Sequence, residues 1–253
     1  MSVRARTIWF IAGGILVAVV VAGVVVLFAF RDRATSVDPE EIVVTVTTGG
    51  GAPGDYGLYT YETTGYETTD SLAGSRHDYP AQTYLTIQPG GCGTLVRWQG
   101  LEQRYEEWDL CADGTMTGWS SFHQWFGVEN TDVWKCPEPM PVQGEPGASW
   151  QAECDRVSSQ EAGEGHKTLA YEVVGPETLT VGDETVETLH VRISSLQTGG
   201  SEGYGLTDLW YLPGTNLPVR WVEQASSTTD TRIGAVGWAE QFEALLTSLQ
   251  PGG

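Results

Sequence analysis

The sequence predicts a mainly β protein in which one N-terminal transmembrane helix precedes a curved antiparallel β-sheet that ends in a short C-terminal helix. Three observations predict this class. Residues 8–30 carry no charge, and the chain after them consists of short β-branched and aromatic segments separated by Gly, Pro or Asp-Gly. All four cysteines lie in that later part, which predicts a disulfide-bonded domain.

The uncharged stretch, Ile8–Phe30, reads IWFIAGGILVAVVVAGVVVLFAF and holds 23 residues. As a helix it would span about 35 Å, enough to cross a hydrocarbon core of about 30 Å. A cleavable signal peptide is the rival interpretation, because Arg4 and Arg6 precede the stretch. The apolar core of a signal peptide is usually about 7–15 residues long, so we expect an uncleaved anchor.

The charges that flank the stretch do not orient it, since Arg4 and Arg6 on one side balance Arg31 and Arg33 on the other. The even number of cysteines indicates an oxidising compartment for the domain that follows. We therefore expect a single-pass plasma-membrane protein whose N-terminus is cytoplasmic. Its expected parts are a cytoplasmic tail (1–7), a transmembrane anchor (8–30), a linker (31–55) and an extracytoplasmic β domain (56–253).

The expected domain is strongly acidic. After residue 33 the chain has nine Lys and Arg against 32 Asp and Glu, a formal charge of −23. Such a surface excludes binding to a nucleic-acid backbone and repels anionic lipid head groups. The carboxylates do not follow the spacing of a calcium-binding loop, so no metal site is expected.

The first half of the domain, 56–156, contains a predicted hairpin that fixes one disulfide. Folding Leu95–Trp98 onto Tyr105–Trp108 places Leu95 opposite Trp108 and Trp98 opposite Tyr105, and the same register brings Cys92 opposite Cys111. By elimination, Cys136 pairs with Cys154 around a loop rich in Pro and Gly. Before the hairpin, we expect a Thr- and Tyr-rich strand that bends or bulges at Gly65.

The second half, 167–250, reads as a meander of strands joined by Gly-Asp, Gly-Gly and Pro-Gly turns. The tail Ala239–Leu249 is ambiguous between strand and helix. Phe242, Leu245, Leu246 and Leu249 follow a helical stripe, which favours a short helix.

Two stretches of the second half, ETLTVGDETVETLHVRI and DLWYLPGTNLPVRW, resemble LolA-like and lipoprotein-like half-barrel domains of bacterial envelopes. The resemblance covers residues 168–238. It implies a strongly curved half-barrel sheet, often with a helix on its concave side, and several such domains bind lipid or acyl chains. The whole chain also resembles single-pass, signal-anchored envelope proteins of high-GC Gram-positive bacteria. The resemblance is structural and assigns no functional residue.

No catalytic motif occurs in the sequence, and no two of its histidines have metal-ligand spacing, so we expect no catalytic residue, metal or cofactor. His77, next to Asp78, is interpreted as a solvated or turn-capping loop residue. His123 is interpreted as a residue at the rim of an aromatic patch. A hydrolase that uses His77 or His123 is kept as an alternative.

The densest aromatic segment, WSSFHQWF, is too aromatic for a simple alternation of core and surface residues. Most Trp and Tyr side chains are expected to pack the core of a twisted sheet. This segment is the best candidate to line a groove for a hydrophobic ligand, through Trp119, Phe122, Trp125 and Phe126.

The function expected from the sequence is therefore a non-enzymatic binding or structural module of the cell envelope. Its expected partners are the membrane, through Ile8–Phe30, and a lipid or another envelope protein, but not nucleic acid. The alternatives are a subunit of an envelope complex without a ligand of its own and an envelope hydrolase.

Overall fold

The computed structural model of the protein describes residues 32–42, 52, 54–71, 74–158, 164–231 and 234–252. These residues form a 3-10 turn, Pro39–Glu41, and thirteen strands. The strands are β1 (Gly57–Thr69), β2 (Ser75–Asp78), β3 (Gln82–Pro89), β4 (Gly93–Leu101), β5 (Arg104–Cys111), β6 (Thr115–Trp125), β7 (Val128–Pro141), β8 (Ser149–Ser158), β9 (Gly165–Val181), β10 (Glu184–Gly199), β11 (Ser201–Tyr211), β12 (Pro218–Thr231) and β13 (Gly234–Leu246).

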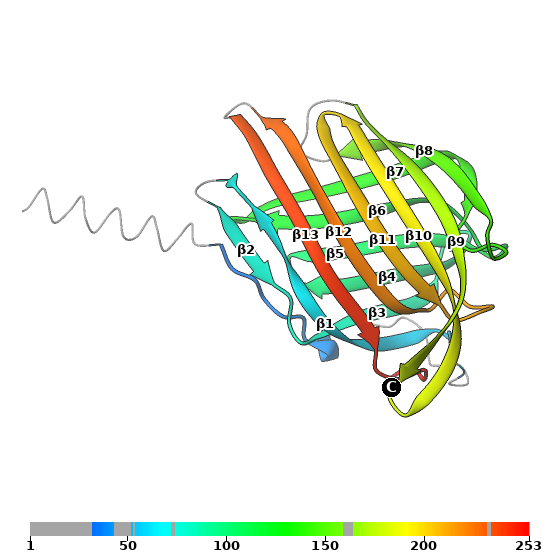
Figure 1. The fold of residues 1–253 in the computed structure, drawn as a ribbon. Helices are drawn as coiled ribbons and strands as arrows, with labels where there is room; N and C mark the ends of the chain where they lie inside the picture. Colours follow the sequence, from blue (N-terminus) through cyan, green and yellow to red (C-terminus); the bar gives the residue numbers. More distant parts are fainter. Residues whose placement is uncertain are drawn as a thin grey trace, which may run out of the picture.

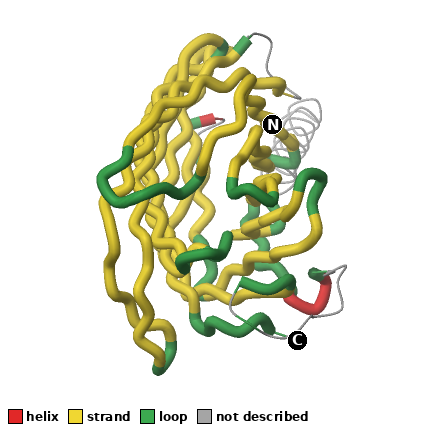
Figure 2. The backbone as a smooth tube through the Cα atoms, turned by 90° about the vertical axis from the view of Figure 1, so that its right-hand side faces the viewer, coloured by secondary structure: helices red, strands yellow, loops and turns green. Residues whose placement is uncertain are grey.

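The strands form one antiparallel sheet that closes into a barrel. From β3 to β13 each strand pairs with the next in sequence, and β13 then pairs with β1, whose first half pairs with β3. Figure 1 shows β9 to β13 as one side of this barrel, with β3 to β8 behind them. Figure 2 shows the barrel turned by 90°, where short loops join the strands. Closure removes the free sheet edges that an open sheet would expose, except at the short strand β2, which pairs only with β1.

The closed barrel corrects the fold class predicted from the sequence. Mainly β structure is confirmed, but the sheet is not an open half-barrel, and the described residues hold no helix on a concave side. The C-terminal segment is strand β13 and not a helix. Phe242, Ala244 and Leu246 alternate toward the core and pair with β1, so the closing strand takes the place of the expected helix.

The predicted membrane anchor also needs correction. Across the described residues, no helix has the length and apolar character needed to cross a membrane. The stretch Ile8–Phe30 and the tail before it lie outside those residues, as does part of the linker 31–55. The structure therefore gives no support to the signal-anchor helix or to the single-pass plasma-membrane location derived from it.

Gly65 marks a change of partner along β1. Residues 57–62 pair with β3, whereas residues 66–69 pair with β2. Gly65 has φ 138°, and a Cβ there would lie 2.2 Å from the backbone oxygen of Gln241, so only glycine is accommodated. The bend expected at this residue is where the short strand β2, which carries His77, joins the sheet.

An aromatic core fills one part of the barrel. The rings of Trp98 and Phe242 stack with centroids 4.6 Å apart, and Trp221 packs edge-on to both at 5.1 and 4.9 Å. Leu217 and Leu249, which lie in the segments after β11 and β13, are also buried in this core. These rings come from β4, β12 and β13, so the core joins strands far apart in the sequence.

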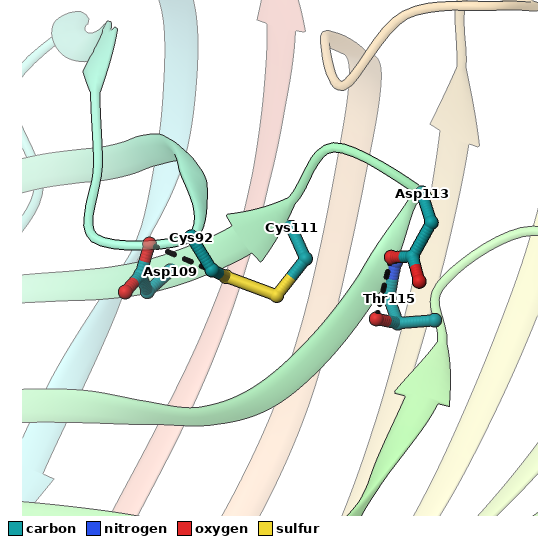
Figure 3. Close-up of a disulfide and its surroundings, with 5 residues drawn as sticks. All are labelled: Cys92, Asp109, Cys111, Asp113 and Thr115. Carbon is teal, nitrogen blue, oxygen red and sulfur yellow. Dashed lines mark hydrogen bonds between the residues drawn. A yellow bond between two sulfur atoms is a disulfide. The ribbon is translucent and has the colours of Figure 1, made fainter.

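The two disulfides are Cys92–Cys111 and Cys136–Cys154, the same two pairs that the sequence predicted. The first lies at the start of β4 and the end of β5 (Figure 3). The hairpin register that suggested it was wrong by one residue, because Val96, and not Leu95, faces Trp108. A bulge between Gln99 and Leu101 causes the shift. In the strand pairing Cys111 therefore lies opposite Gly93. Its disulfide partner, Cys92, is the residue immediately before Gly93.

Removing a disulfide should lower stability substantially. For the Cys136→Ala/Cys154→Ala variant we expect a loss of about 3 kcal/mol in the free energy of unfolding, because the bond closes a loop of sequence separation 18. Urea denaturation under non-reducing conditions measures the loss. The Cys92→Ala/Cys111→Ala variant opens a loop of separation 19 and serves as the comparison. A loss below about 1 kcal/mol in both variants would contradict the entropic account.

Candidate functional site in the barrel interior

The barrel interior contains a band of charged residues above the aromatic core. Strand alternation turns every second residue inward, and several of those positions are charged where apolar residues would be expected. The inward charged residues with buried side chains come from β1, β5, β8 and β13: Glu67, Arg104, Arg156 and Glu240. Because isolated buried charges are costly, each must find a partner inside the barrel.

Arg104 connects two strands across the interior. Its Nε and Nη2 donate to the two carboxylate oxygens of Glu240 at 3.1 and 2.9 Å, and Nη2 also donates to Glu106 Oε1 at 2.6 Å. Tyr79 donates its hydroxyl to Glu240 as well. The Arg104 side chain is only 1% exposed. This bidentate pair therefore joins β5 to β13 in a site without bulk water.

A second cluster holds Glu67 between two histidines. His77 Nδ1 donates to Glu67 Oε1 at 3.0 Å, and His123 Nδ1 lies 3.0 Å from Glu67 Oε2. The indole of Trp238 donates to the same Oε2 at 3.2 Å. On its other side, His77 Nε2 lies 2.9 Å from Asp32 Oδ2, while Trp125 stacks on the imidazole at 4.0 Å.

These contacts determine the charge of the cluster. Both ring nitrogens of His77 face carboxylate oxygens, so both must donate, and the ring is an imidazolium. Burial alone would lower the pKa of His77, but Glu67 and Asp32 outweigh it and raise that pKa above 6.5. Burial would raise the pKa of Glu67, but the bonds from His123 and His77 outweigh it and lower that pKa to about 2. The carboxylate of Glu67 stays ionised although its side chain is buried.

Replacing Glu67 tests the stabilising role of this cluster. The pKa of Glu67 is lowered by folding from 4.5 to about 2, so its contribution is present above pH 4.5 and is lost as the pH falls toward 2. We expect Glu67→Gln to cost about 3 kcal/mol at pH 5.5 and progressively less in more acidic buffer. Urea unfolding at several pH values measures this dependence.

Glu62→Gln is the matched control for that experiment. Glu62 occupies the same position in the first YETT segment of β1, but its side chain is exposed. We expect a change below about 1 kcal/mol at every pH. Equal effects of the two variants, or an effect of Glu67→Gln that grows toward pH 2, would contradict the assignment.

Beside these clusters the barrel contains a cavity. A volume of about 350 Å³ is lined by four indoles, Trp119, Trp125, Trp134 and Trp238. It extends to the end of the barrel where the β6–β7, β10–β11 and β12–β13 hairpins lie, because residues next to these hairpins line it: Val128, Ser201 and Thr231. The cavity is therefore placed between the charged band and one end of the barrel.

A smaller volume of about 130 Å³ continues the cavity toward the core. The two volumes share five lining residues: Glu106, Trp119, Lys167, Ser195 and Glu223. The smaller one is more apolar, with Trp108, Ile193 and Leu209 in its wall. Together they form one elongated space in which aromatic rings are interspersed with polar and charged side chains.

The structure divides the aromatic residues predicted to line a ligand groove. Trp119 and Trp125 line the cavity. Phe122 faces outward, where its ring stacks on Tyr105 at 5.0 Å. Phe126 lies in the turn after β6 with φ 53°, and its backbone N–H donates to Asp32. Alternation along β6 explains the split, since residues 119, 121, 123 and 125 all turn inward.

His77 and His123, which the sequence placed in a loop and at a rim, lie together in the interior. The interpretation of His77 as a solvated residue was wrong, because β2 buries it to 1% exposure. Both nitrogens of His77 are engaged by carboxylates, so this ring has no free nitrogen to activate a nucleophile. The described residues also contain no group of His, Cys, Asp and Glu arranged to hold a metal ion.

No family model, curated protein or solved structure matches this chain. The site must therefore be interpreted from its own geometry.

Proposed function

We propose that the protein is a non-enzymatic binding module that takes up a small, elongated, mainly apolar molecule inside the barrel. The observation that supports this most directly is the indole-lined cavity of about 350 Å³ next to one end of the barrel. Ligand pockets usually measure about 300–1,000 Å³ and combine apolar walls with a few polar groups. The volume of this cavity lies in that range, and its four indoles supply apolar wall between the polar side chains.

The surroundings of the cavity also support binding. The closed sheet and the Cys136–Cys154 bond restrain its walls, so little ordering is needed when a ligand enters. The charged clusters around Arg104 and Glu67 are internally satisfied, so an apolar ligand would not have to desolvate them. An apolar molecule that displaces water from the indole faces gains free energy in proportion to the area buried.

Binding of a neutral fluorescent probe, N-phenyl-1-naphthylamine, tests the proposal. We expect one probe per chain, with a blue-shifted and enhanced emission, because the dye leaves water for an apolar cavity. The variant Ser195→Phe places a ring where the two volumes meet and should weaken binding at least about tenfold. Fluorescence titration measures both affinities.

Ser194→Phe is the control, since the side chain of Ser194 is exposed on the outer face of the same strand. It should leave the affinity unchanged, and thermal unfolding should show that both variants are folded. Absence of stoichiometric binding, or equal affinities of Ser195→Phe and the wild type, would overturn the proposed function.

A further inference from the structure

Lys167 is a cation in the cavity wall that forms no ion pair with a described residue, although nearby carboxylates, Glu106 above all, act to raise its pKa against the effect of burial. It lines both volumes, and its Nζ lies 4.4 Å from the centroid of Trp134 and 5.3 Å from that of Trp119. Among the described residues, none forms an ion pair or hydrogen bond with this Nζ. The chain has one other lysine, Lys135, which is exposed on β7.

Aromatic faces alone are weak compensation for a buried ammonium group. A cation–π contact contributes less free energy than an ammonium group loses when it is removed from water. Burial accordingly lowers the pKa of Lys167. A ligand that supplied a negative charge next to Nζ would remove this cost, whereas a cationic ligand would add repulsion to it.

Glu223 is a second residue of the cavity wall that could donate a hydrogen bond to a ligand. Its Oε2 already accepts hydrogen bonds from Thr207 Oγ1 at 2.7 Å and from the Trp221 indole at 3.1 Å. A proton on this carboxyl group must therefore lie on Oε1. Burial, followed by the charges of Glu106 and Glu240, raises the pKa of Glu223 to about 8, so the group is mostly protonated at neutral pH. In that state it is a hydrogen-bond donor.

We propose that the ligand is an organic acid whose carboxylate is bound by Lys167 Nζ beside the carboxyl group of Glu223, with its apolar body between the indoles of the larger cavity. This inference rests on the proposed function and names the chemical class of its ligand. Lys167 and Glu223 both line the junction of the two volumes, so a single carboxylate placed there is close to both. The charge of the ligand then gives Lys167 the ion pair that it does not form with any described residue.

Competition against bound N-phenyl-1-naphthylamine tests the inference, with decanoic acid and 1-decanol as matched competitors at pH 7. Decanoic acid is ionised at this pH and decanol is neutral, while their chains are equal in length. We expect Lys167→Met to weaken the binding of decanoate at least about tenfold and that of decanol by less than about threefold, because only the carboxylate loses a charge-assisted hydrogen bond. Lys167→Arg should retain most of the affinity for decanoate. Lys135→Met should change neither affinity.

The other possible results contradict either the carboxylate site alone or the binding function as well. If Lys167→Met weakens acid and alcohol equally, or weakens neither, the carboxylate site is wrong although the binding function stands. The same holds if the probe binds to the wild type but decanoate does not displace it. If the probe itself does not bind, the proposed function fails, and the inference fails with it.

Discussion

Replacing Arg104 by methionine should lower the free energy of unfolding by about 3–5 kcal/mol, because it leaves the carboxylates of Glu240 and Glu106 without their cation. Glu240 is 3% exposed, so water cannot replace the lost hydrogen bonds. The substitution also disconnects β5 from β13, whose pairing with β1 closes the barrel. Urea denaturation at pH 7 gives the loss directly.

Two further variants separate the charge effect from lost packing. Arg104→Met/Glu240→Gln removes both charges of the pair and should recover a large part of the stability. Removing both partners costs less than removing one, because no buried charge is left without a partner. Arg97→Met removes a half-exposed arginine of β4 that lies 3.8 Å from Glu107, and should cost less than about 1 kcal/mol. If Arg104→Met costs no more than Arg97→Met, the pair with Glu240 does not contribute to stability.

Local patterns in the sequence predicted the strands and the disulfide pairs but not the closure of the sheet. The cysteines flank a hairpin or a loop, so short-range alternation was sufficient to pair them. The bulge after Gln99 has no signature in the alternation of side chains, and it shifted the register. The pairing of β13 with β1 joins Tyr61 to Leu246, and no local signal reports a contact over such a distance in sequence.

The C-terminal tail shows why the helix prediction failed. Phe242 and Leu246 satisfy both a helical stripe and a strand alternation, so the pattern could not distinguish them. What decides between the two is the tertiary context, since β12 and β1 both leave an edge that only a strand can fill. Intrinsic preference yields to such context in many proteins.

The charged residues of the interior were harder to predict from the sequence than the aromatic lining. Glu62 and Glu67 occupy equivalent positions in the two YETT segments, yet one is exposed and the other buried. Their separation of five residues places them on opposite faces of β1, and only the burial of one face identifies Glu67. Its partner His77 lies on the separate short strand β2, so the cluster becomes apparent only when the sheet is assembled.

Glu223→Gln should stabilise the protein in alkaline solution, by about 4 kcal/mol at pH 9. Folding raises the pKa of Glu223 from 4.5 to about 8, chiefly by burial. Below pH 4.5 the carboxyl group is protonated in both states. As the pH rises toward 8, the unfolded chain loses this proton while the folded chain retains it, so the stability of the wild type falls. Glutamine does not titrate and can still accept the bonds from Thr207 and Trp221.

The difference in unfolding free energy between Glu223→Gln and the wild type should therefore grow from pH 5 to about pH 8 and level off toward pH 9. Urea unfolding at each pH measures it, with Glu243→Gln as the control. Glu243 is half-exposed on β13 and pairs with Arg220, so its replacement should change stability by less than about 1 kcal/mol at any pH. This dependence is opposite in sign to that of Glu67, whose pKa is lowered by folding. Parallel stability curves for Glu223→Gln and the wild type would show that Glu223 is ionised in the folded protein, and the cavity would then lack its second donor for a carboxylate.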